Sequence, residues 1–168
     1  EISKNIVVIP GLGHGIDTWK ENKSNQQSVY EYLQQPGYHV IILELSENDY
    51  QLPEQELLNY INSLIPEKSY LLAHSFGCVI ALLYSHHYPH KIKGMILLDP
   101  TTQMERYRLE RIKDLSFRNS LLSLLNQQEL LKNLNFCPII SYVIVPFKKL
   151  MNTQKKITDG YVFEILNT

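Results

Sequence analysis

The sequence predicts an α/β protein built on a doubly wound, mostly parallel sheet. Short apolar runs alternate along the chain with segments of helical periodicity, and proline, glycine or polar residues separate them. This alternation is typical of right-handed βαβ units, which place successive strands side by side in parallel. With 168 residues, of which 44% are hydrophobic and 20% charged, the chain suits one globular domain covering 1–168.

Five apolar runs are predicted to be strands. The first is a β-branched run closed by Pro10-Gly11, which is typical of a strand buried on both faces of a parallel sheet. The second run is expected to be buried in the same way, and a polar loop follows it at 46–51. The predicted strands are 5–9, 38–45, 69–73, 93–100 and 138–145.

Helices are predicted between these strands. One ends at Pro36-Gly37, and the next begins after Pro53 with apolar residues spaced along one face. Residues 101–137 interrupt the alternation, with a charged first part and a leucine-rich second part, and are predicted to form a helical lid over the carboxyl ends of the strands. The other predicted helices are 28–35, 54–65, 76–87 and a last one near 154–167.

The segment Ala73-His74-Ser75-Phe76-Gly77 lies at a predicted strand-to-helix junction. Small residues two positions before and after Ser75 allow a tight turn that exposes its hydroxyl above the sheet edge. The following helix directs its first N–H groups and the positive end of its dipole to the same place. The pattern therefore predicts a nucleophilic serine. The alternative is a buried serine at an ordinary junction, because a first-position alanine departs from Gly-x-Ser-x-Gly.

The loop after the first strand, Gly11-Leu12-Gly13-His14-Gly15, is rich in glycine. Its backbone can approach a ligand closely and turn N–H groups inward, so it can supply a second oxyanion donor. A flexible turn is the alternative. A dinucleotide-binding loop is not predicted, because the third glycine spacing is missing and no clear helix follows.

With these two motifs in place, the chain resembles the α/β-hydrolase family over nearly its full length, in a minimal form whose last strand is expected to be missing. The segment Ala73-His74-Ser75-Phe76-Gly77 resembles the nucleophile elbow of this family, the turn that carries the reactive serine, and looks most like that of small bacterial lipases and esterases. The other points of likeness are Trp19, Gly37-Tyr38-x-Val40, Tyr88-Pro89 and Leu97-Leu98-Asp99-Pro100.

The resemblance implies hydrolysis of a carboxylic ester or thioester through an acyl-enzyme on Ser75. It implies an oxyanion hole formed by the N–H groups of Leu12 and Phe76, and a pocket rim formed by Gly11, Gly13, His14 and His74. The catalytic acid would be Asp99, at the carboxyl end of a strand, or Asp159. A structural Asp99 that caps the following turn is the alternative.

The general base is the missing part of this pattern, because in the family the catalytic histidine comes last and here no histidine follows His90. His86 lies about 16 Å along the helix from Ser75, too far for proton transfer. His87 and His90 lie at or beyond the same helix end, His39 begins a strand, and His74 diverges from Ser75. Only His14 can reach the pocket, where a rim or structural role is expected.

Two hypotheses follow from the missing histidine. Either the molecule continues beyond residue 168 in a longer form, or it is a truncated, catalytically impaired relative. The second case leads to the alternative function, a non-catalytic scaffold that binds a small apolar ligand or a protein partner through the lid.

Composition excludes several other classes. A net charge of −1 without a basic cluster argues against nucleic-acid binding, and no apolar run reaches the roughly 20 residues of a membrane span. No metal-ligand spacing occurs, and no cofactor is expected. Cys78 and Cys137 are too few for a disulfide framework, and Cys78 is expected to be a small core residue, so a cytoplasmic, reduced protein is expected. The expected partner is a small acyl substrate, and no oligomeric state is predicted.

Overall fold

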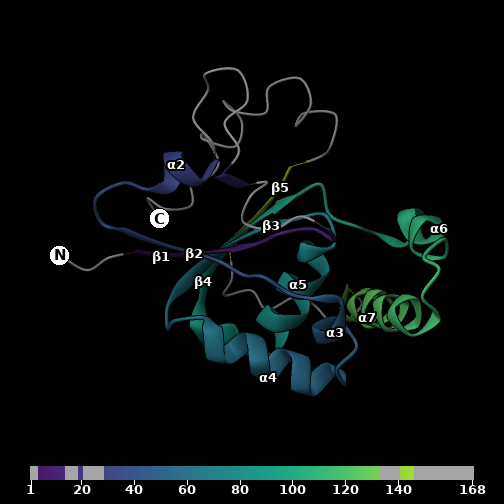
Figure 1. Cartoon of the computed structure of the whole chain (residues 1–168). Helices are drawn as coiled ribbons and strands as arrows, with labels where there is room; N and C mark the ends of the chain where they lie inside the picture. Colours follow the sequence, from purple (N-terminus) through teal and green to yellow (C-terminus); the bar gives the residue numbers. More distant parts are fainter. Residues whose placement is uncertain (1–3, 14–18, 21–28, 133–140, 146–168) are drawn as a thin grey trace.

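The computed structural model describes residues 4–13, 19–20, 29–132 and 141–145 (Figure 1). All five predicted strands are present in one parallel sheet with the order β2-β1-β3-β4-β5. The predicted helix near 154–167 lies outside the described residues. The strands are β1 (Lys4–Ile9), β2 (Tyr38–Ile42), β3 (Ser69–His74), β4 (Ile92–Leu98) and β5 (Ser141–Val145).

Helices cover both faces of the sheet, so the fold is doubly wound as predicted. The short helix α2 (Val29–Leu33) lies on one face, and α4 (Glu54–Leu64), α5 (Gly77–His87) and α7 (Leu115–Lys132) lie on the other (Figure 1). The helix expected at 28–35 is thus shorter than predicted, whereas those expected at 54–65 and 76–87 match within one residue at each end.

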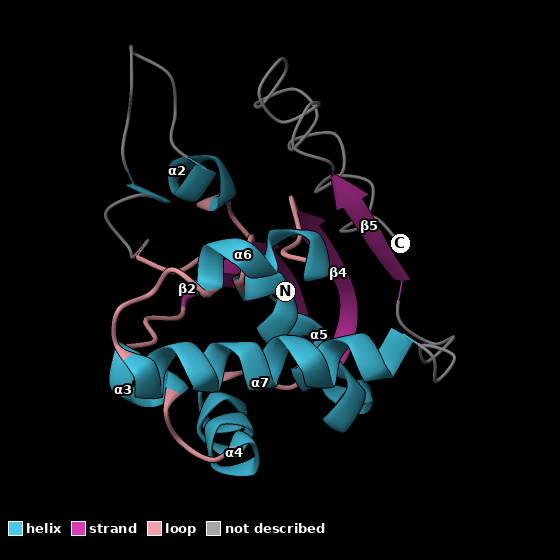
Figure 2. Cartoon of the chain, turned by 90° about the vertical axis from the view of Figure 1, so that its right-hand side faces the viewer, coloured by secondary structure: helices cyan, strands magenta, loops and turns pink. Residues whose placement is uncertain are grey.

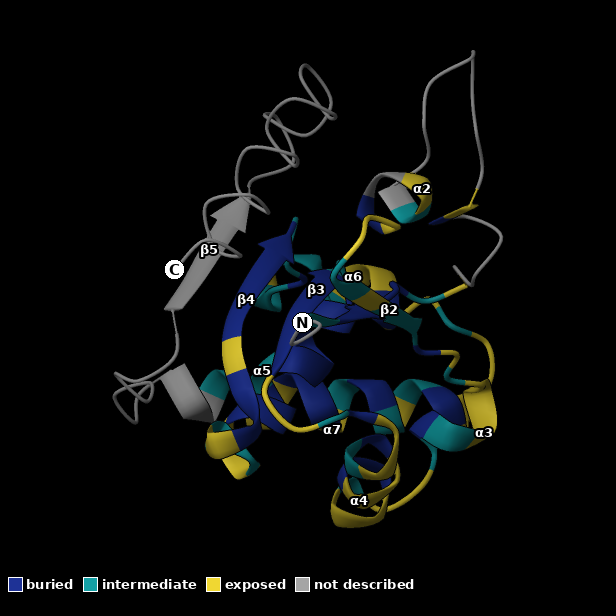
Figure 3. Ribbon diagram, turned by 90° about the vertical axis from the view of Figure 1, so that its left-hand side faces the viewer, coloured by how far each residue is buried: buried dark blue, intermediate teal, exposed yellow. Residues whose placement is uncertain are grey.

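Alternate strand residues build two separate cores, one on each face. Val7, Leu71 and Leu97 join the larger core with the helices α4, α5 and α7. Val8 and Leu72 point the other way and join the smaller core beneath α2. The central strands β3 and β4 are therefore almost entirely buried (Figure 3), which explains why their sequences are continuous apolar runs instead of alternating ones.

The second strand corrects one expectation. Residues 38–45 were expected to form a strand buried on both faces, but β2 ends at Ile42 and its residues are partly exposed. The reason is its position at the edge of the described sheet, where β1 is its one partner among the described strands. The loop expected at 46–51 contains the short helix α3 (Glu47–Tyr50), which Ser46 caps through a reciprocal bond pair with Asp49.

The segment expected to be a lid divides into two parts with different surroundings. Its charged first part forms a short 3₁₀ turn, η2 (Gln103–Glu105), and the helix α6 (Arg106–Leu109). Its leucine-rich second part is α7, which packs beside α5 and α3 (Figure 2) and buries Leu121, Leu124 and Leu125 in the larger core. A lid function for 101–137 stays a prediction, and residues 133–137 lie outside the described residues.

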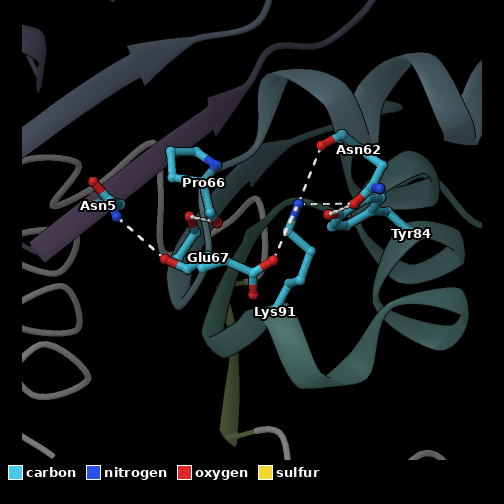
Figure 4. A network of polar contacts seen from close by, with 7 residues as sticks. Asn5, Asn62, Pro66, Glu67, Tyr84 and Lys91 are labelled. Carbon is cyan, nitrogen blue, oxygen red and sulfur yellow. Dashed lines mark hydrogen bonds and ion pairs between the residues drawn. The ribbon is translucent and has the colours of Figure 1, made fainter.

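A buried lysine, Lys91, connects several elements near the amino-terminal edge of the sheet. Lys91, in the 3₁₀ turn η1 (Pro89–Lys91), donates to the side-chain and main-chain oxygens of Asn62 at 2.9 and 3.1 Å (Figure 4). The hydroxyl of Tyr84 donates to the same Asn62 oxygen at 2.9 Å, and the carboxylate of Glu67 lies 4.0 Å from the ammonium. These contacts connect α4, α5 and the start of β4 on the side of the sheet away from Ser75.

Candidate active site

Three loops meet at the carboxyl edge of the sheet. Residues 10–13 follow β1, Ser75 follows β3, and Asp99 follows β4. The strands β1 and β3 are neighbours in the sheet. From β1 the chain continues to β2 on one side of this pair, and from β3 it continues to β4 on the other side. Such a reversal of strand order is where open α/β sheets bind their ligands.

Ser75 lies in a tight turn between β3 and α5. Its φ angle is 54°, in the left-handed region that a non-glycine residue rarely adopts. Its N–H donates to the carbonyl of Leu98 at 3.0 Å, and its own carbonyl accepts from the N–H groups of Cys78 and Thr101 at 3.1 and 3.2 Å. The end of β4, the loop after it and the first turn of α5 thus bind both backbone polar groups of Ser75.

Small residues around Ser75 are required by the space available. A Cβ atom at Gly77 would collide with the carbonyl oxygen of Ile9 and lie 2.7 Å from that of Pro10. A Cβ atom at Gly11 would lie 3.1 Å from the Cβ of Ser75. The glycines therefore let the loop after β1 pack directly against the turn that presents Ser75.

A cavity of about 350 Å³ opens at this edge of the sheet. It brings together four residues singled out by the sequence, namely Leu12, Ser75, Phe76 and Asp99. The remaining lining comes from the segment after β4, whose members are Pro100, Thr101, Glu105, Arg108, Leu109 and Ile112. The cavity thus lies beside Ser75 at the carboxyl edge of the sheet, and the charged part of the segment 101–137 provides one of its walls.

Two backbone N–H groups are available beside Ser75. Among the described residues, no hydrogen-bond acceptor is found for the N–H of Leu12 or of Phe76. The side chain of Phe76 is 1% exposed and its ring lies 5.9 Å from that of Tyr50, which fixes the backbone at this position. Both donors can therefore bind an oxygen atom without first losing another bond.

The hydroxyl of Ser75 has Thr101 as its partner. The two hydroxyl oxygens are 3.3 Å apart, and either can donate. Among the described residues, no histidine lines the cavity. His14 and Asp159 lie outside the described residues.

The other predicted rim residues lie near the cavity but do not line it. His74 belongs to β3, and its ring packs edge-on against Trp19 with centroids 6.4 Å apart. Gly11 contacts the turn, and Gly13 has a φ of 72° with open space around its Cα. The remaining described histidines are far from this edge. His39 contacts Asn5 at the amino end of β2. His86 and His87 end α5, and His90 lies in the turn that follows.

Asp99 is the second strained residue at the cavity, with a φ of 46°. Burial raises the pKa of its carboxyl above the ordinary value, and the nearby carboxylate of Glu105 acts in the same direction. The positive charges of His74 and Arg108 oppose this by lowering the pKa. Asp99 is thus the cavity carboxyl whose pKa is raised, whereas the pKa of Glu105 is lowered.

Three polar residues at the cavity were not singled out by the sequence. Thr101, Glu105 and Arg108 all follow β4. A signal was present for one of them, because Thr102-x-x-Glu105 is a capping-box pattern and Thr102 does form the reciprocal bonds with Glu105. Thr101 and Arg108 carry no such signal, since their placement depends on how the chain turns after Asp99.

Three further observations complete the description of these residues. In the described part of the chain, no group of three or more His, Cys, Asp or Glu side chains could hold a metal ion. Likewise, none of the described helices is long and apolar enough to cross a membrane. Cys78 is buried in the first turn of α5 as predicted, and burial raises the pKa of its thiol.

Comparison with known proteins supports this architecture. The family model described as alpha/beta hydrolase fold matches residues 4–117. An "Abhydrolase domain-containing protein abhd-5.2" of Caenorhabditis elegans is 29% identical over 102 residues, which cover 56% of this chain and 23% of the relative. The match thus spans about a quarter of the length of that relative.

Solved structures show the same fold at low sequence identity. MGS-MChE2, an α/β-hydrolase enzyme from a lagoon-sediment metagenome, superposes with a TM-score of 0.66 at 16% identity, covering 96% of this chain and 90% of its own. A structure from a study of carboxylesterases of the thaumarchaeon Nitrososphaera gargenis gives 0.60 at 14% identity, covering 98% and 92%.

Proposed function

The chain belongs to the α/β-hydrolase fold family, and on that premise we propose that it is a serine hydrolase that cleaves carboxylic esters or thioesters. The observation that carries the proposal is the position of Ser75. It occupies a left-handed turn at the carboxyl end of β3, at the start of α5. It lines a cavity with Leu12 and Phe76, whose backbone N–H groups have no acceptor among the described residues. Few structural roles require a serine in so constrained a place.

The proposed reaction begins with attack of the Ser75 oxygen on the carbonyl carbon of the ester. The proton of the hydroxyl passes to a base, and the carbonyl oxygen becomes an oxyanion that the N–H groups of Leu12 and Phe76 bind. Collapse of this intermediate releases the alcohol or thiol, which takes a proton, and leaves an acyl-enzyme. Water then attacks the acyl-enzyme, which releases the carboxylic acid and restores Ser75.

Asp99 is proposed as the acidic member of the site. It follows the strand adjacent to that of Ser75, lines the same cavity, and lies close enough to the His74 imidazole for that ring to affect its pKa. A carboxylate there can orient the catalytic base and stabilise the positive charge that the base acquires.

A second function is supported by the contact of the Ser75 hydroxyl with Thr101. Within the described residues this hydroxyl has no imidazole partner to activate it, which suits a non-catalytic scaffold that holds a small apolar ligand in the same cavity. The two proposals differ in whether the site turns over an ester.

Turnover of 4-nitrophenyl butyrate by the full chain separates them. We expect hydrolysis that falls at least about a thousandfold in Ser75→Ala, because the acyl-enzyme cannot form. Ser116→Ala is the matched control, since Ser116 is exposed and donates to Gln51 outside the cavity. Absence of turnover in the folded wild type, or equal turnover in Ser75→Ala, would reject the hydrolase and favour the scaffold.

A further inference from the structure

Arg108 is the one cation among the described residues that line the cavity. Its side chain is exposed, and its Nε donates to the hydroxyl of Tyr107 at 3.2 Å. No salt bridge joins it to any described carboxylate, and no acceptor is found among the described residues for its two terminal nitrogens. The guanidinium thus has most of its donors available at the cavity.

The two carboxylates of the cavity do not use these donors. Glu105 accepts the N–H and the hydroxyl of Thr102, both at 2.7 Å, and these bonds outweigh burial and hold the pKa of Glu105 below its ordinary value. Asp99 follows the end of β4, which is the strand next to the one that ends before Ser75. Both carboxylates repel an anion, and the charge of Arg108 lowers the pKa of each of them. Among the side chains of the described lining, Arg108 is the one whose charge attracts a negatively charged group.

The remaining lining is mostly apolar. Leu12, Phe76, Leu109 and Ile112 are contributed by three different segments, and Pro100 adds to them. Ligand cavities of this kind combine an apolar body with a few polar groups that decide orientation, and about 350 Å³ is at the small end of their range. A fitting ligand therefore has a short apolar part and one anionic end.

We propose that Arg108 selects, for the hydrolase proposed above, esters that carry an anionic oxyacid group, a carboxylate or a phosphate, in addition to the ester bond. The proposal rests on that function and names its substrate class. The planar guanidinium offers paired donors that match the two oxygens of a carboxylate or phosphate, and the side chain is already oriented by Tyr107. Arg108 is thus a specificity-determining residue, with no part in bond breaking.

The chain provides a matched control for this arginine. Arg111 lies against the same tyrosine ring, with its guanidinium 5.6 Å from the ring centroid of Tyr107 compared with 5.7 Å for Arg108, but it does not line the cavity. Arg111→Ala therefore removes another exposed cation beside the same tyrosine, and Arg111 does not line the cavity.

The test compares anionic esters with neutral ones of matched length. Mono-4-nitrophenyl adipate is compared with 4-nitrophenyl hexanoate, and 2-phosphoethyl butyrate with ethyl butyrate. In the wild type we expect kcat/KM to favour at least one anionic member. Arg108→Ala should reduce that preference about threefold to tenfold, mainly through KM, and 1 M salt should weaken it. Arg108→Lys should retain part of the preference, and Arg111→Ala all of it.

The two arms also identify the group that is recognised. A preference confined to the adipate pair indicates a carboxylate on the acyl side, and one confined to the phosphoethyl pair indicates a phosphate on the alcohol side. No preference in the wild type, or the same loss in Arg111→Ala as in Arg108→Ala, would overturn the proposal.

A binding measurement separates failure of this proposal from failure of the hydrolase. Octanoate and octanamide are titrated by NMR into Ser75→Ala protein, with and without Arg108→Ala. If no ester is turned over but octanoate binds more tightly than octanamide in an Arg108-dependent way, the hydrolase is rejected and the anion site stands. Equal binding of both ligands would overturn the anion site.

Discussion

Ser75 and Asp99 leave two adjacent parallel strands at the same level, and both do so in a left-handed conformation. His74 at the end of β3 pairs with Leu98 at the end of β4, so each strained residue is the next one along its own chain segment. The N–H of Ser75 donates to the carbonyl of Leu98, which couples the two turns directly. Two strained residues side by side at a cavity indicate a site whose backbone is held in place by the surrounding sheet.

The strain at Ser75 predicts a gain in stability when it is relieved. Ser75→Gly should unfold with a free energy about 1 kcal/mol higher than Ser75→Ala, because alanine keeps the left-handed penalty and glycine does not. Both variants lose the hydroxyl contact with Thr101, so their difference isolates the backbone. Urea unfolding measures it, and equal stability of the two variants would mean that the turn is relaxed.

The close packing behind the turn predicts the opposite effect at Gly77. Gly77→Ala should destabilise the chain by about 2 to 3 kcal/mol, because its Cβ would collide with the main chain of β1. Gly37→Ala is the control, since Gly37 has a φ of 87° but open space around it, and should cost about 1 kcal/mol. A smaller loss at Gly77 than at Gly37 in thermal or urea unfolding would contradict the packing.

The electrostatics of Asp99 predict a stability difference that depends on pH. Burial raises its pKa in the folded state, so ionisation costs stability once the pH exceeds the unfolded value of about 3.9. Asp99→Asn removes that cost. The stability of the variant relative to the wild type should therefore rise between pH 3.5 and pH 7. At pH 3.5 the Asp99 carboxyl is mostly protonated in both the folded and the unfolded chain, so the cost is small there. Glu44→Gln, at an exposed position, is the control. A difference that is the same at both pH values would argue against the raised pKa.

The buried lysine predicts unequal effects of two asparagines on one helix. Asn62→Ala should cost about 2 to 3 kcal/mol, because the ammonium of Lys91 and the hydroxyl of Tyr84 both lose an acceptor in a part-buried place. Asn59→Ala removes two exposed bonds, those that Tyr88 and Gln55 donate to the Asn59 side-chain oxygen, and should cost about 0.5 kcal/mol. Denaturant unfolding compares them, and equal losses would show that the Lys91 contacts contribute little.

The sheet was predictable from the sequence because buried parallel strands are continuous apolar runs and Ser75 follows one of them. All five strands were found, and the turn at Ser75 has the tight geometry that its small neighbours indicate. The edge position of β2 was not predictable in this way. Its run 38–45 has the same composition as a central strand, and only the strand order decides how much of it is covered.

The wall of the cavity was the less predictable part of the site. Asp99 directly follows a strand, and Leu12 and Phe76 lie within three residues of a strand end, so topology places all three at one edge of the sheet. Arg108 and Thr101 depend on the path of an irregular segment, which no periodicity describes. The leucine-rich part of the predicted lid 101–137 buries leucines in the larger core beside α5, and a lid function for the segment stays a prediction.

The most direct test of the account is covalent labelling of the folded full chain with a fluorophosphonate, which reacts with activated serines. Mass spectrometry of the tryptic peptide 69–91 distinguishes Ser75 from Ser69 and Ser85. The account predicts modification at Ser75 alone, absent in Ser75→Ala. A folded protein in which Ser75 stays unmodified, or in which other serines react equally, would contradict it.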